Sequence, residues 1–171
     1  MIRFIARVLF KNILGWKFSG NTDFSQNSIK KAVIIAAPHT SSHDFYIGVL
    51  ARSAANLNSK FIAKKEIFFF PLNIILKFLG GVPVDRSKKL NRVDQISEMF
   101  DNKNEFRVAL SPEGTRQRVE KFKTGFYYIA KKANVPIIMF TLNFKDKEIL
   151  ISETFYTTNN MQSDFNYIEE F

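Results

Sequence analysis

Both histidines of the chain lie within the short stretch from Ala36 to Asp44. A neutral imidazole can accept a proton from a hydroxyl near neutral pH, and a carboxylate on its other ring nitrogen fixes the tautomer. His39 and Asp44 are therefore a candidate pair of general base and orienting carboxylate. The same stretch has a structural reading, because Ser41 followed three residues later by Asp44 is a capping box at a helix start. A His-x4-Asp spacing is weak evidence alone, so the pair needs support from elsewhere in the chain.

Two arginines follow short apolar runs further along the chain. Arg86 follows the run that begins at Gly81, and Arg116 ends the segment Ser-Pro-Glu-Gly-Thr-Arg that begins at Ser111. A guanidinium donates hydrogen bonds in a planar fork that suits a phosphate or a carboxylate. Both arginines also have structural alternatives, since Arg86 can pair with the neighbouring Asp85 and the second segment can be a plain turn with a surface arginine. The sequence alone does not decide between anion binding and these structural roles.

The composition narrows the classes of partner and of chemistry. The 171 residues carry 25 Lys and Arg against 16 Asp and Glu, and the net charge of +9 favours an anionic partner. Nucleic acid, anionic lipid, a phosphorylated substrate and an acidic carrier protein all fit that charge. The absence of cysteine excludes disulfides, thiol catalysis and thiolate metal sites, and two histidines alone are a poor ligand set, so we expect no metal.

Apolar runs typical of strands alternate with amphipathic runs typical of helices. This alternation predicts a single α/β domain, with a mostly parallel sheet flanked by helices on both faces and a final antiparallel edge strand. The carboxyl ends of parallel strands share one edge, so we expect His39, Arg86 and Arg116 to lie along it. The expected strands are 31–35, 60–64, 81–87, 106–110, 135–142 and 149–151, and the expected helices are 44–57, 91–102 and 126–133.

Residues 1–18 form a separate unit in this interpretation. Apolar residues recur there at helical spacing, interrupted by Arg and Lys, and the single Trp of the chain lies near the end of the segment. The segment is too short and too charged to span a bilayer. We therefore predict an N-terminal amphipathic helix on a membrane surface over 1–18, a polar connector, and the main domain over 29–171. The alternative is an ordinary helix that packs on the domain.

Two further segments have roles that the sequence leaves open. Residues 66–80 are the most apolar part of the chain, with Pro71 suited to a helix start and Gly80 to its end. They form either a buried core helix or an apolar lip that faces lipid or an acyl chain, and we expect the buried helix. Residues 168–171 have the pattern of a helix without a C-terminal cap, as expected of a truncated sequence.

Four segments, taken in order, resemble the motif blocks of the glycerolipid acyltransferases, whose type member is 1-acylglycerol-3-phosphate acyltransferase. They are His39-x4-Asp44, 81–87, 112–116 and 135–138, and the resemblance runs from about Val33 to Leu142. It implies that His39 is the general base and that Asp44 orients it. It also implies that the acceptor's phosphate is bound by Arg86 and by the block Glu113, Gly114, Thr115 and Arg116.

The sequence departs from this family pattern beside two of the blocks. Pro38 precedes the histidine where the best-known members have Asn, and Ser111 stands where they usually have Phe. These differences bear on the acceptor more than on the reaction. His43 occupies a variable position inside the first block, so we treat it as a neighbour of the base.

The resemblance implies an enzyme of phospholipid biosynthesis. It would move a fatty acyl group from acyl-CoA or acyl-carrier protein to the hydroxyl of a lysophospholipid acceptor, with 1-acylglycerol-3-phosphate expected, and would use no cofactor. We expect a peripheral protein on the cytoplasmic face of the membrane, where its positive charge attracts anionic lipid and an acidic donor.

Two alternatives stay open at this point. The first is the same reaction on a lyso-lipid without glycerol phosphate, such as an acylated amino acid, whose carboxylate Arg86 and Arg116 would bind equally well. The second is a non-catalytic module that binds lipid or nucleic acid through its positive charge. Nucleic-acid binding predicts aromatics interleaved with a basic stripe, whereas the aromatics here cluster in apolar runs, so we expect no nucleic-acid partner. The acyl chain length, the donor and the oligomeric state are not fixed by the sequence.

Overall fold

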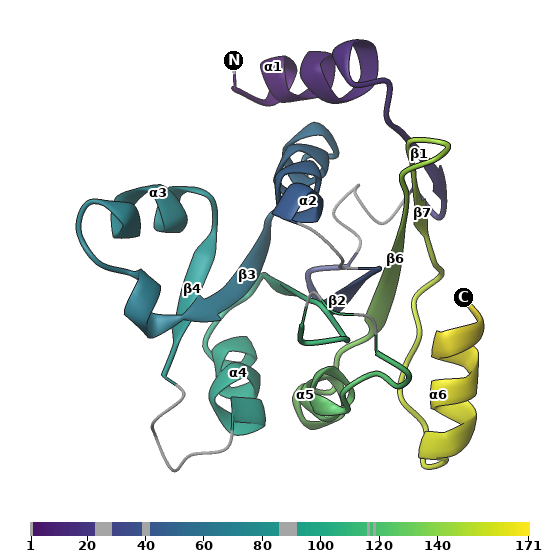
Figure 1. Cartoon of the computed structure of the whole chain (residues 1–171). Coiled ribbons are helices and arrows are strands. Elements are labelled where there is room, and N and C mark those ends of the chain that lie inside the picture. The colour runs from purple at the N-terminus through teal and green to yellow at the C-terminus, as the bar shows by residue number, and fades with distance from the viewer. Residues whose placement is uncertain (1, 23–28, 39–41, 86–91, 116, 118) are drawn as a thin grey trace.

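The structure is a computed structural model of the chain, and it describes residues 2–22, 29–38, 42–85, 92–115, 117 and 119–171. These residues contain a seven-stranded sheet in the order β1-β7-β6-β2-β5-β3-β4, with helices on both faces (Figure 1). The strands are β1 (Lys17–Gly20), β2 (Lys31–Ala37), β3 (Ser59–Lys64), β4 (Gly81–Val84), β5 (Phe106–Leu110), β6 (Ile137–Asn143) and β7 (Glu148–Ile151). The helices are α1 (Ile2–Val8), α2 (Ser42–Ala54), α3 (Leu72–Phe78), α4 (Arg92–Asp101), α5 (Gly125–Ala133) and α6 (Met161–Glu170), with a π-helical turn η1 (Leu9–Ile13) and a 3-10 turn η3 (Lys65–Ile67).

The sheet is parallel from β6 across to β4. β2 pairs in parallel with β5 on one side and with β6 on the other, so Ile35 lies opposite both Leu110 and Met139. β5, β3 and β4 continue in the same direction, and β7 pairs antiparallel with β6. The predicted α/β class with a mostly parallel sheet is therefore confirmed.

The strand at the edge of the sheet beside β7 was not predicted. β1 pairs with β7 and takes the edge position that the sequence interpretation gave to β7. Lys17 and Phe18, which were expected in the N-terminal helix, belong to this strand. The helical segment ends at Ile13 because Gly15 adopts a left-handed backbone with φ of +73°, which commonly ends helices. Phe18 then stacks on Phe10 of η1 with ring centroids 4.8 Å apart.

Each face of the sheet buries its own core. Alternation along β2 sends Val33 and Ile35 to one face and Ala32 and Ile34 to the other, as the two-residue period of a strand requires. The first face packs against α4, α5 and α6, and the second against α2 and η1 (Figure 1). Because both faces of the central strands are covered, these strands are continuous apolar runs in the sequence.

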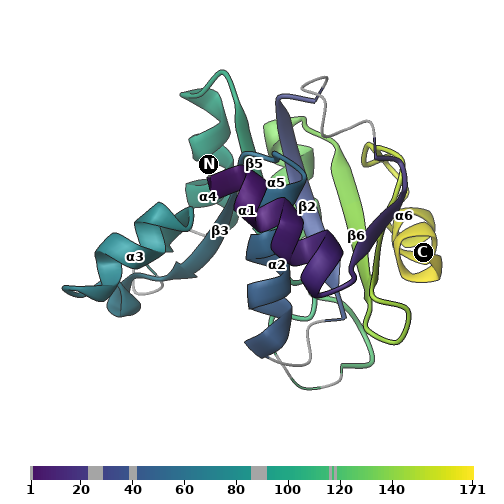
Figure 2. The same cartoon turned by 90° about the horizontal axis from the view of Figure 1, so that it is seen from above.

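The N-terminal helix packs on the domain with one of its sides. Ala6 is buried, and the Arg7 guanidinium donates from Nε to the Ala54 carbonyl of α2 at 3.4 Å. Figure 2 shows α1 lying across α2. The opposite side exposes Phe4 and Ile13, and its contact with a membrane stays a prediction. No helix in the described ranges is long and apolar enough to cross a bilayer.

The prediction of a buried core helix over 66–80 is wrong. The segment forms η3 and the short helix α3, which packs against β4 at the edge of the sheet (Figure 1). Phe70, Ile74 and Phe78 are 79%, 60% and 70% exposed. A helix at the sheet edge is covered on one side only, so a segment that is apolar all round presents an apolar surface. The alternative of an apolar lip describes this segment better.

A buried carboxylate anchors α6. Asp164 is 3% exposed and accepts hydrogen bonds from the Tyr127 hydroxyl at 2.8 Å and from the Thr158 N–H and hydroxyl at 2.7 Å each. Burial raises the pKa of this carboxyl, but the hydrogen bonds from Thr158 and Tyr127 and the charge of Lys131 outweigh burial and hold the pKa below its ordinary 3.8. Burial and the bond to Asp164 also raise the pKa of Tyr127 to about 12. The network ties α6 to α5.

We expect Asp164→Ala to destabilise the fold by roughly 3 kcal/mol, because it removes three hydrogen bonds to a charged acceptor, one of them from the buried Tyr127 hydroxyl. The wild-type contribution should be fully present above pH 3.8 and lost as the pH falls through the lowered folded-state pKa, since the folded state favours the ionised carboxyl. Urea unfolding followed by the fluorescence of Trp16, the single tryptophan, measures both effects. The control Asp94→Ala removes an exposed ion pair between α4 and α5 and should cost much less. Equal losses from the two variants would contradict the assignment.

Candidate active site

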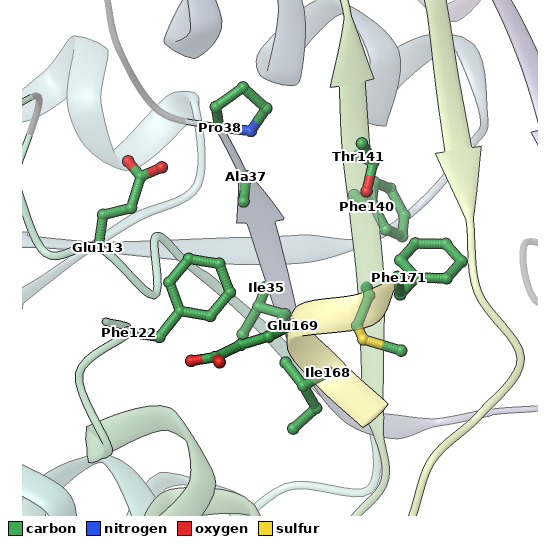
Figure 3. A pocket seen from close by; sticks show the side chains of 11 residues that line it. Ile35, Ala37, Pro38, Glu113, Phe122, Phe140, Thr141, Ile168, Glu169 and Phe171 are labelled. Carbon is green, nitrogen blue, oxygen red and sulfur yellow. The ribbon is translucent and has the colours of Figure 1, made fainter. Parts of the chain in front are cut away.

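The carboxyl ends of the parallel strands border a pocket of about 250 Å³. The ends of β2 and β6, the turn after β5 and the last turn of α6 line it (Figure 3). Figure 3 shows Glu113 and Phe122 on one side of the β2 end, and Thr141 and Phe171 on the other. Most of the lining residues are apolar, and two of them, Glu113 and Glu169, carry a carboxylate. The pocket lies where open α/β sheets bind their ligands.

Three predicted site residues lie outside the described part of the chain: His39, Arg86 and Arg116. The residues just before them show which strand ends lead to them. Pro38, at the end of β2, lines the pocket, and Thr115 follows the turn whose Glu113 lines it. Val84, at the end of β4, lies opposite Lys64 at the end of β3. All three segments therefore leave the sheet at the same edge, as predicted.

Asp44 lies in the first turn of α2, directly after the segment that follows β2. Its side chain is 6% exposed, whereas the neighbouring His43 is exposed. A carboxylate in the first turn of a helix is stabilised by the partial positive charge of the helix N-terminus. The fold thus supplies a buried carboxylate close in sequence to His39, and its role in orienting the imidazole stays a prediction.

The turn after β5 points a second carboxylate into the pocket. The Gly114 N–H donates to the Ser111 carbonyl at 3.2 Å and closes a tight turn. Gly114 has φ of +63°, a left-handed conformation that favours glycine. Glu113, just before it, is 7% exposed and lines the pocket. The Pro112 carbonyl accepts a hydrogen bond from the Lys123 N–H at 2.8 Å, which holds the segment before α5 against the turn.

The side chain of Lys123 lies over the turn at Gly114. A methyl group on Gly114 would lie 2.8 Å from both Cδ and Nζ of Lys123, so this side chain passes directly over the turn. The lysine ammonium forms no ion pair within the described ranges. The sequence shows two lysines here, Lys121 and Lys123, and only the folded backbone distinguishes the one that reaches Gly114.

The apolar wall of the pocket was also missed by the sequence analysis. Phe122 precedes Lys123, and Ile168 and Phe171 come from the C-terminal end of the chain. α6 reaches the pocket because the Asp164 network fixes it beside α5. No spacing in the sequence connects a C-terminal helix with a motif near its beginning, so the tertiary fold alone reveals this wall.

Asp85, beside the predicted Arg86, has a cation partner of its own. The Lys65 ammonium lies 3.3 Å from its carboxylate, and the Gln95 side-chain amide donates to its backbone carbonyl at 3.3 Å. These contacts connect the end of β4 with η3 and α4. Whether Arg86 shares Asp85, the alternative raised by the sequence, lies outside the described residues.

Metal binding finds no support in the part of the chain that is described. No three side chains of His, Cys, Asp or Glu gather there as a metal site requires. The expectation that the site needs no metal or cofactor stays a prediction.

The fold defines an α/β protein with a pocket at the carboxyl ends of its parallel strands, and a solved structure shares that fold. The crystal structure of the 1-acyl-sn-glycerophosphate (LPA) acyltransferase PlsC from Thermotoga maritima matches with a TM-score of 0.65, over 99% of this chain and 74% of that chain. The identity is 19%, so this match shows the common fold.

Sequence comparisons identify the family. The family model described as Acyltransferase matches residues 16–142, which include every predicted site residue, so the chain belongs to this family of acyltransferases. It is 30% identical, over 61% of its length, to the 1-acyl-sn-glycerol-3-phosphate acyltransferase BAT2, chloroplastic, of Brassica napus. It is 29% identical, over 62% of its length, to the corresponding enzyme LPAT1, chloroplastic, of Arabidopsis thaliana. The chain spans about a third of the length of these two relatives.

We expect Gly114→Ala to lower the free energy of unfolding by roughly 1–2 kcal/mol, the cost of a left-handed conformation for a residue with a side chain. The new methyl group should also displace Lys123 from the turn. Gly48→Ala is the matched control, because Gly48 lies within α2 and an added methyl meets nothing within 4 Å. That change should raise stability by about 0.5–1 kcal/mol. Urea unfolding of both variants tests this, and an unchanged or raised stability of Gly114→Ala would contradict the turn geometry.

Proposed function

We propose that the protein is an acyltransferase that moves a fatty acyl group from an acyl thioester to the hydroxyl of a lysophospholipid. One observation supports this most: the pocket brings together the strand end that leads to His39 and the turn that carries Glu113, Gly114 and Thr115. These are two of the motif blocks by which the sequence resembles the glycerolipid acyltransferases. Because Pro38, directly before His39, and Glu113 line the same pocket, the proposed base and the proposed phosphate-binding block can act on one substrate.

His39 acts as the general base in the proposed reaction. Its neutral imidazole removes the proton from the acceptor hydroxyl while the hydroxyl oxygen attacks the carbonyl carbon of the thioester. A carbon–oxygen bond forms, the carbon–sulfur bond breaks, and the leaving thiolate takes the proton from the imidazolium. Asp44 steadies the imidazolium while it exists, without itself being protonated. No acyl-enzyme intermediate is needed.

The acceptor's phosphate is the group that Arg86 and Arg116 bind in this proposal. A guanidinium matches two phosphate oxygens at once, so two arginines can fix both the position and the charge of the headgroup. Lys123, lying over Gly114, adds positive charge beside this block. The apolar lining of the pocket can accept a hydrocarbon part of either substrate. The expected acceptor is 1-acylglycerol-3-phosphate, the substrate in the names of the two plant relatives.

The proposed place of action is the membrane surface, with acyl-CoA or acyl-carrier protein as donor. The net charge of +9 attracts both anionic lipid and an acidic donor. The exposed side of the N-terminal helical segment, with Phe4 of α1 and Ile13 of η1, suits contact with the headgroup region. We propose a peripheral protein on the cytoplasmic face, acting in phospholipid biosynthesis.

The reaction can be tested by the release of CoA from palmitoyl-CoA, with a panel of acceptors. The protein has no cysteine, so a thiol reagent detects only the liberated CoA. We expect release that depends on lysophosphatidic acid. Release with an acylated amino acid alone would keep the reaction and exclude the phosphate acceptor. No release with any lyso-lipid, from either CoA or carrier-protein donors, would contradict acyl transfer.

The phosphate assignment has a test of its own. We expect Arg116→Gln to raise the KM for lysophosphatidic acid by about tenfold or more, because it removes a charge-assisted bond to the phosphate. The KM for monoacylglycerol, which has no phosphate, should barely change. Arg3→Gln on the exposed side of α1 is the matched control and should leave both values unchanged when the substrates are dispersed in detergent. An equal effect of Arg116→Gln on both acceptors would contradict phosphate binding by Arg116.

A further inference from the structure

An apolar surface at the β4 edge of the sheet has no role in the site described above. We call it the α3 surface, and it is formed by the exposed side chains of Ile67, Phe69, Phe70, Ile74, Ile75 and Phe78. Phe69 and Ile75 are 60% and 54% exposed. Phe70, Ile74 and Phe78 are at least as exposed as Phe69. Figures 1 and 2 show α3 at the edge of the molecule, with no other described helix over its outer side.

α3 is apolar on its outer side as well as on the side that faces the domain. A helix on the surface of a soluble domain normally turns its apolar residues toward the core and its polar residues outward. In α3, Ile74, Ile75 and Phe78 face outward, while Asn73 Oδ1 is buried and has no hydrogen-bond partner within the described part of the chain. The outer side therefore suits an apolar medium.

The charges around the α3 surface favour an anionic partner. Between Ser59 and Gly80 the sequence has four lysines and a single acidic residue, Glu66. Lys77 is exposed within α3 itself, and Lys64 is exposed at the end of β3. An apolar patch bordered by lysines matches the chemistry of an anionic lipid surface. A second copy of this chain would bring the same positive charge against it, so like charges oppose self-association here.

The α3 surface also begins at the edge of the sheet that carries the pocket. β3 leaves its carboxyl end directly into η3 and then into Phe69 and Phe70. A lipid surface in contact with these residues would thus lie at the same edge as the ends of β2 and β5, where the pocket lies.

We propose that the α3 surface docks the protein on an anionic membrane, with its aromatic and isoleucine side chains among the lipid headgroups and Lys77 beside them. The purpose of this contact, which is to bring the pocket to its lipid substrate, rests on the proposed function. Docking itself can be measured without acyl transfer.

Sedimentation with vesicles tests the apolar part of the proposal. We expect wild type to bind vesicles of phosphatidylcholine mixed with phosphatidylglycerol. The double variant Phe70→Ser/Phe78→Ser should bind at least about tenfold more weakly, because two exposed aromatic side chains are lost. Tyr156→Ser is the control, since Tyr156 is 60% exposed outside this surface, and it should bind as wild type does. Circular dichroism and thermal unfolding establish that each variant is folded.

Charge is tested by a separate variant. Lys77→Gln should weaken binding to the vesicles that contain phosphatidylglycerol by about fivefold and leave binding to pure phosphatidylcholine unchanged. Added salt should weaken wild-type binding to the anionic vesicles for the same reason.

Three outcomes would overturn the proposal. They are wild type that does not bind anionic vesicles, a folded double variant that binds as tightly as wild type, and a wild-type dimer that the double variant loses. The acyl-transfer assay separates this result from the proposed function. With substrates dispersed in detergent, the double variant should release CoA as wild type does. If wild type itself releases no CoA, the proposed function fails, and sedimentation still decides whether the α3 surface binds lipid.

Discussion

β2 pairs in parallel with β5 on one side and with β6 on the other, and this pairing positions the helices and the pocket around it. It places Ile35 level with Leu110 and Met139, so the segments that follow β2 and β5, which lead to the motifs of His39 and Arg116, leave the sheet at one edge. The pairing is stable because both faces of these strands are buried, one under α2 and η1 and the other under α4, α5 and α6. A slip of one residue would exchange the side chains of the two faces, which the alternating core residues of β2 oppose.

Three carboxylates are buried in different parts of this fold. Asp164 is held by Tyr127 and Thr158, away from the strand ends, and serves to fix α6. Through α6 it also places Ile168 in the wall of the pocket. Asp44 and Glu113 lie instead on the segments that follow β2 and β5, at a helix start and in a tight turn. Asp44 and Glu113 thus lie on segments that follow parallel strands of the sheet, whereas Asp164 lies within α6.

Much of this arrangement could be predicted from the sequence, for identifiable reasons. The central strands are buried on both sides, so their apolar runs were unambiguous, and the parallel order alone brings the segments of His39, Arg86 and Arg116 to one edge. The prediction failed where tertiary packing decides. β1 depends on the left-handed Gly15 and on an edge left open beside β7, and α3 is exposed because the sheet ends at β4. Lys123 could not be told from Lys121 without the backbone that folds it over Gly114.

We propose that the chain transfers acyl groups with His39 as the base. The most direct measurement is the rate of CoA release from palmitoyl-CoA in the presence of lysophosphatidic acid, for wild type, His39→Ala and His43→Ala. We predict that His39→Ala lowers the acceptor-dependent rate by roughly 10²–10⁴-fold without unfolding the protein, the usual contribution of a general base. His43→Ala should keep most of the rate, because its side chain is exposed beside Asp44. A folded His39→Ala that releases CoA at the wild-type rate would contradict the account.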